Sequence, residues 1–116
     1  MLPKKHRLTK NKDFQELYKK GASVFLPPLA LRYKKIGKNK NSRFGFVVSN
    51  KIYKKSTARN LLKRRLRAMV NNKLKQILPG FDCVITTRAK IRGKNYQQIE
   101  EDLERLFTRA KILNKI

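Results

Sequence analysis

Five side chains in the middle of the chain have the types and the spacing of a phosphate-binding surface. They are Arg59, Asn60, Lys63, Arg64 and Arg67, and at about 100° per residue of an α-helix they share an arc of about 140°. Basic groups held on a rigid helix can contact several phosphates at once, and arginine can do so with two parallel hydrogen bonds. A solvated helix face normally mixes both signs of charge. Because this arc contains no acid, it favours contact with RNA or DNA over a plain solvent-exposed face.

One long helix must position this arc. The sequence predicts a helix over residues 58–78, with Ser56 or Thr57 as its N-cap and Pro79-Gly80 as its end. Apolar residues on the opposite flank would attach the helix to a core and leave the basic arc at the surface. This flank consists of Leu62, Leu66 and Met69.

The rest of the pattern predicts a small mixed protein of the α+β class, in one domain over residues 1–116. The order is α-β-β-α-β-α, with room for an additional short strand at 23–25. The two strands before the long helix are expected to pair as a hairpin. The predicted elements are a helix capped by Thr9 or Asn11 and ended by Gly21, strands over 29–34 and 43–49, the long helix, a strand over 82–87 and a helix over 96–113.

The charge of the chain points to a polyanionic partner. Its 116 residues include 31 Lys+Arg and 7 Asp+Glu, for a net charge of +24, and no acid lies between Leu17 and Phe81. Apolar residues are interleaved with the basic ones, so the positive charge sits on a folded surface rather than on a disordered tail. Such a surface binds nucleic acid by releasing condensed counterions. An anionic membrane or mere solubility is the weaker alternative.

Several classes of protein are excluded by composition. No run of about 18 apolar residues could span a membrane, and the basic start of the chain lacks the apolar stretch of a signal peptide. We therefore expect a cytoplasmic protein that does not associate with membranes. One cysteine and one histidine cannot make a disulfide scaffold or a zinc finger.

The segment Arg59-Asn60-Leu61-Leu62-Lys63-Arg64-Arg65-Leu66-Arg67 resembles the RNR motif of the bacterial ribonuclease P protein component. Three further segments resemble the same family in the same order. They are the first helix from Arg7 to Ser23, the strand and loop from Gly45 to Ile52, and the last strand from Asp82 to Arg88. A short basic motif is weak support alone, whereas four ordered segments over nearly the whole chain are specific.

The resemblance implies the accessory subunit of a ribonucleoprotein that removes the 5′ leader from precursor tRNA. The RNA subunit would perform Mg²⁺-dependent hydrolysis, with Mg²⁺ held mainly by RNA and substrate. The partners would be ribonuclease P RNA and precursor tRNA, without an obligate protein partner. The residues agree with this division, because the sequence contains no recognisable catalytic constellation. The implied fold is an α/β sandwich with a left-handed strand-helix-strand crossover, although general statistics favour the opposite hand.

The resemblance also implies two RNA-facing surfaces. One would contact the RNA subunit through a basic loop and the motif helix, that is, through Lys51, Lys54, Lys55, Arg59, Asn60, Lys63, Arg64 and Arg67. The other is a cleft for the single-stranded leader, between the first helix and the sheet, lined by Phe14, Tyr18, Leu31, Tyr33 and Arg88. Aromatic rings rimmed by Lys19, Lys20 and Arg32 suit the stacking of unpaired bases, and core packing is the alternative role of each ring.

Two other functions share the size and charge of this chain. A ribosomal or other structural RNA-binding protein is the first, and the ordered set of motifs argues against it. A DNA-binding architectural protein is the second, but the sequence shows no helix-turn-helix signature, heptad zipper or zinc site.

Overall fold

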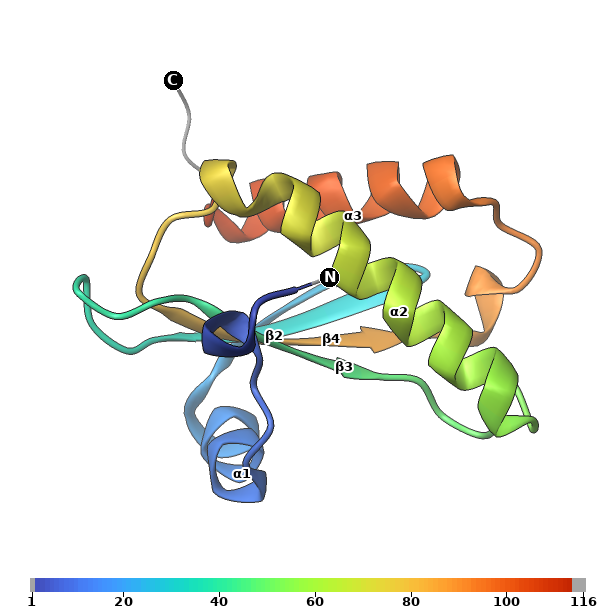
Figure 1. Cartoon of the computed structure of the whole chain (residues 1–116), viewed down its shortest axis with the longest axis horizontal. Helices are drawn as coiled ribbons and strands as arrows, with labels where there is room; N and C mark the ends of the chain where they lie inside the picture. Colours follow the sequence, from blue (N-terminus) through green and yellow to red (C-terminus); the bar gives the residue numbers. More distant parts are fainter. Residues whose placement is uncertain (1, 114–116) are drawn as a thin grey trace.

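The computed structural model describes residues 2–113, and a four-stranded sheet forms its centre (Figure 1). The strands are β1 (Ala22–Leu26), β2 (Leu29–Lys35), β3 (Arg43–Val47) and β4 (Phe81–Thr87). They lie side by side in the order β1-β2-β4-β3. β2 is antiparallel to both β1 and β4, whereas β3 and β4 are parallel.

The expected hairpin between the second and third strands is wrong. β4 lies between β2 and β3, and the hairpin that forms joins β1 to β2. The reason lies in the composition of β4, whose residues Phe81 to Ile85 are all buried. A strand that is largely apolar and buried on both faces gains most at the centre of a sheet, where both faces are covered.

Three helices cover the two faces of the sheet (Figure 1). α1 (Asn11–Lys20) lies on one face, and α2 (Ser56–Lys73) and α3 (Tyr96–Ala110) lie on the other. All three are where the sequence predicts them, but α2 and α3 end earlier than expected. α2 gives way to a short 3₁₀ turn at Leu74–Gln76, and no side chain caps α1 or α2 at its N-terminus.

α3 has the firmest start of the three helices. The Asn95 side chain accepts a hydrogen bond from the Gln98 N–H at 2.9 Å, and the Gln98 side chain accepts one from the Asn95 N–H at 3.0 Å. This reciprocal capping box satisfies two of the backbone donors that a helix start leaves unpaired.

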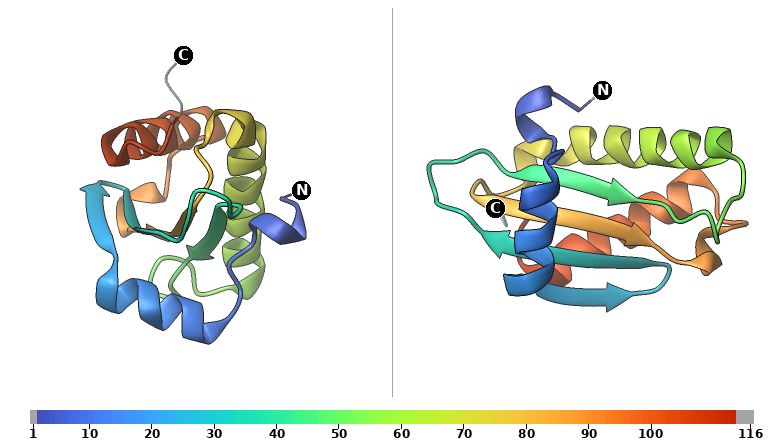
Figure 2. Two further views of the ribbon diagram at one scale, coloured as in Figure 1. Left: turned by 90° about the vertical axis from the view of Figure 1, so that its left-hand side faces the viewer. Right: turned by 90° about the horizontal axis from the view of Figure 1, so that it is seen from below.

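The connection from β3 through α2 to β4 has the hand that the family resemblance implies. With the α1 face toward the viewer, β3 and β4 run the same way and α2 passes behind the sheet (Figure 2, right). β4 then lies on the side of β3 that makes the crossover left-handed. Most crossovers of this kind are right-handed, so a rule drawn from general statistics gives the wrong topology here.

Strand alternation divides the core into two layers. Leu31, Phe44 and Ile85 face α2 and α3, where the ring of Phe44 lies 6.0 Å from that of Phe107. The layer under α1 is smaller. It contains Leu8, Leu17 and Val84, with Phe14 and Val47 packed against them.

Candidate nucleic-acid interface

The basic arc lies on α2 as the sequence predicts. Leu62, Leu66, Met69 and Val70 are buried on one flank of the helix. The opposite flank leaves Asn60 and Arg64 exposed, with Arg59, Lys63 and Arg67 partly exposed. In the described part of the chain, no carboxylate lies within ion-pair distance of these four basic residues. Their charges are therefore available to an anionic partner.

Arg59 also supports the loop that precedes α2. Its Nη1 donates hydrogen bonds to the backbone oxygens of Tyr53, at 2.9 Å, and Lys54, at 2.7 Å. Ile52 is buried and anchors the same loop to the core. The lysines of this loop remain exposed beside the start of α2, so one continuous basic surface forms. It comprises Lys51, Lys54 and Lys55 with the basic arc of α2.

A second candidate surface is a groove on the α1 face of the sheet, about 370 Å³ in volume. Two aromatic rings line it, each covered by a guanidinium. Arg32 lies 5.7 Å from the ring centroid of Tyr18, and Arg88 lies 5.4 Å from that of Phe25. The groove is lined by Tyr18, Ser23, Val24, Phe25, Ala30, Leu31, Arg32, Val47, Thr86 and Arg88. Rings beside cations along a groove suit the stacking of unpaired bases and the binding of their phosphates.

The structure brings together only part of the predicted leader cleft. Tyr18 and Arg88 line the groove as expected. Phe14 instead packs onto the sheet, where a Cβ added to Gly45 would lie 2.5 Å from its Cζ atom. This ring therefore belongs mainly to the contact between α1 and the sheet.

Leu31 borders the groove, as the prediction has it, but its side chain and that of Tyr33 do not converge with the α1 aromatics. Both side chains point to the other face of the sheet, where Leu31 is fully buried and the ring of Tyr33 lies 6.3 Å from that of Phe81. They do share one strand face, as alternation predicts, but that face meets the α2 and α3 layer.

Two groove residues were underestimated from the sequence. Arg32 was expected only at the rim, yet its guanidinium covers Tyr18 and donates to the Tyr18 backbone oxygen at 2.8 Å. Phe25 was not identified at all. Strand alternation could have identified both residues. Arg32 points to the opposite face from Leu31 and Tyr33, and Phe25 pairs with Ala30, which lies on the same face as Arg32.

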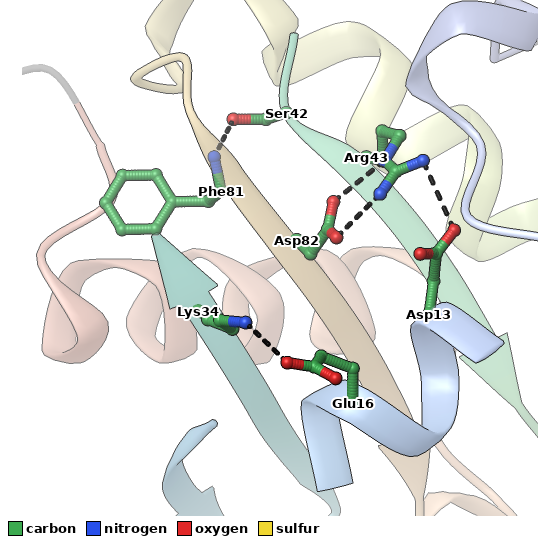
Figure 3. Close-up of polar contacts among 7 residues, drawn as sticks. All are labelled: Asp13, Glu16, Lys34, Ser42, Arg43, Phe81 and Asp82. Carbon is green, nitrogen blue, oxygen red and sulfur yellow. Dashed lines mark hydrogen bonds and ion pairs between the residues drawn. The ribbon is translucent and has the colours of Figure 1, made fainter. Parts of the chain in front are cut away.

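On the other side of α1, ion pairs attach this helix to β2 and β3, and Asp82 of β4 holds the partner on β3 (Figure 3). Arg43 of β3 makes two hydrogen bonds to the buried Asp82 of β4, at 2.9 and 2.7 Å, and lies 3.4 Å from Asp13 of α1. Lys34 of β2 contacts Glu16 of α1 at 3.1 Å. We call this set of five side chains the α1 clamp: Asp13, Glu16, Lys34, Arg43 and Asp82.

The ion pairs shift the pKa values of Glu16 and Arg43 in the direction that favours their charged forms. Hydrogen bonds from Lys34 and then Lys20 lower the pKa of Glu16. The hydrogen bonds to Asp82 raise the pKa of Arg43, although partial burial opposes this. Every carboxylate on the α1 face is thus held beside a cation. Consequently, no unpaired acid on this face repels an approaching phosphate.

The remaining reactive residue types do not form a nucleophilic site. Cys83 is fully buried, and burial raises the pKa of its thiol, which keeps it protonated and unreactive. His6 lies with Nδ1 2.8 Å from the backbone oxygen of Ser42. Neither side chain lies in the basic surface or lines the groove.

No helix among residues 2–113 has the length and the apolar character needed to cross a bilayer.

Comparison with known proteins gives a consistent result. The family model described as Ribonuclease P matches residues 2–111. The ribonuclease P protein component of Synechocystis sp. is 42% identical over 113 residues, which cover 97% of this chain and 91% of that protein. The corresponding protein of Pseudanabaena sp. is 34% identical over 114 residues, covering 98% of both chains.

Solved structures agree with these sequence matches. The RNase P protein of Staphylococcus aureus superposes with a TM-score of 0.86 at 30% identity, over 94% of this chain and 98% of that one. The RNase P protein of Thermotoga maritima superposes with a TM-score of 0.81 at 32% identity, over 89% of this chain and 96% of that one.

Proposed function

This chain belongs to the ribonuclease P protein family, and we propose that it serves this ribonucleoprotein through two separate surfaces. The basic surface of α2 and its preceding loop binds the RNA subunit. The groove beside α1 binds the single-stranded 5′ leader of precursor tRNA. Membership of this family excludes the two alternative functions considered from the sequence, a structural RNA-binding protein and a DNA-binding architectural protein. We also infer a cytoplasmic location, because a subunit with this role meets its tRNA precursors there.

The observation that carries this proposal is the difference between the two surfaces. The α2 surface offers charges without rings, at helical spacing, which suits the phosphates of a folded RNA. The groove offers rings beside guanidiniums, which suits a strand whose bases are unpaired. A leader differs from mature tRNA in being an unpaired extension, so the groove would distinguish substrate from product.

We assign the chemical step to the RNA subunit. Within residues 2–113, no group of three or more His, Cys, Asp or Glu side chains gathers to hold a metal ion. The carboxylates of the α1 face, Asp13, Glu16 and Asp82, are paired with lysine or arginine and do not fit an Mg²⁺ site. In this proposal, RNA and substrate hold the Mg²⁺ that the cleavage requires. The chain contributes binding energy and orientation.

Two substitutions on different surfaces test the assignment. Arg64→Ala should weaken binding of the RNA subunit and reduce the salt dependence of log K by about 0.7 to 0.9 for one lost phosphate contact. Tyr18→Ala should leave this binding unchanged and weaken precursor tRNA, but not mature tRNA, by about 1 to 3 kcal/mol. Filter binding across a salt series measures both. If both variants weakened precursor and mature tRNA alike, the two surfaces would not have separate roles.

A further inference from the structure

Phe25 is a large apolar side chain that the fold leaves in water. It lies on the edge strand β1 and is 58% exposed. A single exposed apolar residue is common on protein surfaces and needs no special explanation. Two facts distinguish Phe25, namely its place in the wall of the groove and the guanidinium of Arg88 5.4 Å from its ring centroid.

The register of the sheet places small residues beside this ring. Phe25 pairs with Ala30, Ala30 pairs with Thr86, and Thr86 pairs with Val47, so these four positions form one row across the α1 face. Ala30 and Thr86 are too short to cover a neighbouring phenyl ring. The row therefore forms a floor on which a flat group could lie against Phe25.

A second row, two residues away along each strand, holds the other aromatic pair. Ser23, Arg32, Val84 and Gly45 form this row, and Arg32 covers Tyr18 of α1. Two residues along a strand span about 6.8 Å, which is about twice the 3.4 Å spacing of stacked bases along one strand. Two bases held at this separation would be too far apart to stack on each other, so each would stack on a protein ring.

We propose that Phe25 and Arg88 form a second stacking platform for the leader, beside the platform of Tyr18 and Arg32. This proposal rests on the proposed function of the groove as the leader site. Phe25 stacks the base of one unpaired nucleotide, and Arg88 contacts the phosphate that flanks it. The groove then holds two leader bases separately, because each ring has its own guanidinium.

Double-mutant cycles between protein and RNA test the platform directly. The probes are precursor tRNAs in which one leader position at a time lacks its base, together with mature tRNA, and the proteins are wild type, Tyr18→Ala and Phe25→Ala. We expect Phe25→Ala to weaken intact precursor by about 5- to 150-fold, which corresponds to about 1 to 3 kcal/mol for one stacked base. This loss should vanish at one abasic position, and the loss from Tyr18→Ala should vanish at a different one.

Control variants separate stacking from folding. Phe25→Tyr should retain affinity, whereas Phe25→Leu, which remains apolar but cannot stack, should behave as Phe25→Ala. Tyr96→Ala removes another exposed ring, which is 38% exposed and lies on α3 away from the groove, and should change nothing.

The possible outcomes distinguish the platform from the function on which it rests. If Tyr18→Ala shows its abasic position and Phe25→Ala shows none, the groove binds the leader and the second platform is refuted. If wild type binds precursor and mature tRNA equally, the leader site and the platform both fail.

Discussion

At the residue scale, the contacts of Arg59 show that the basic residues of the motif do not all have the same role. All the basic residues of the α2 arc look equivalent in the sequence, but Arg59 directs Nη1 to two backbone oxygens of the preceding loop. It therefore orders the loop lysines as well as adding charge. Arg64 is exposed and Arg67 partly exposed, and neither makes such a bond among the described residues, so both guanidiniums are free for the RNA contacts proposed above.

Gly45 of β3 lies in close contact with the ring of Phe14 of α1. A Cβ at this position would lie 2.5 Å from the Phe14 Cζ and 2.7 Å from its Cε1. Gly45→Ala should thus push the Phe14 ring, and α1 with it, away from the sheet. We expect a loss of about 1 to 3 kcal/mol in the free energy of unfolding, as for other overpacked sites. Urea denaturation measures this loss.

The second substitution Phe14→Leu provides the control for Gly45→Ala. A smaller, flexible side chain relieves the clash, so the double variant should be more stable than the sum of the single losses predicts. Simple additivity of the two losses would show that Phe14 and Gly45 do not interact as the structure has them.

At the element scale, periodicity predicted where helices and strands lie but not which strands pair. The strands over 29–35, 43–47 and 81–87 and all three helices follow from local pattern. The order β1-β2-β4-β3 depends on contacts between residues far apart in sequence, which a local sequence pattern cannot predict. The same limit explains the leader cleft. Alternation shows that Leu31 and Tyr33 share a face, but not that this face meets α2 and α3 rather than α1.

The α1 clamp should control leader binding more than stability. In Asp13→Asn/Glu16→Gln, Arg43 keeps its buried partner Asp82, and the lost pairs are partly exposed, so global unfolding should change little. Losing two negative charges would by itself strengthen RNA binding. We expect the opposite for the leader, because α1 carries Tyr18 and loses ion pairs that orient it, although Leu17 and Phe14 still hold the helix on the sheet. The preference for precursor over mature tRNA should fall severalfold in equilibrium binding.

A matched variant isolates the effect of charge alone. Glu100→Gln/Glu101→Gln changes the net charge equally on α3, on the opposite face of the sheet from α1. It should leave the preference for precursor intact and slightly strengthen all RNA binding. If the clamp variant kept its preference for precursor, as the α3 variant should, the ion pairs would not position the helix.

At the scale of the whole molecule, the acids are arranged so that two surfaces stay positive. Those near α1 are neutralised by ion pairs, and the remaining four lie together on α3 between Glu100 and Glu104. One of these, Asp102, is buried and paired with Lys94 at 2.7 Å and with Arg105. A polyanion is thus attracted to the α1 groove and the α2 surface, and least to α3.

The most direct test of the proposed subunit role is cleavage of a 5′-extended precursor tRNA at low Mg²⁺. The reaction contains a bacterial ribonuclease P RNA, this protein, or both. We predict efficient removal of the leader only in the mixture, because the protein would supply binding energy that low Mg²⁺ no longer provides. Cleavage by the protein alone would contradict the assignment of chemistry to RNA. Failure of the mixture to cleave, despite tight binding of the RNA subunit, would contradict the subunit role itself.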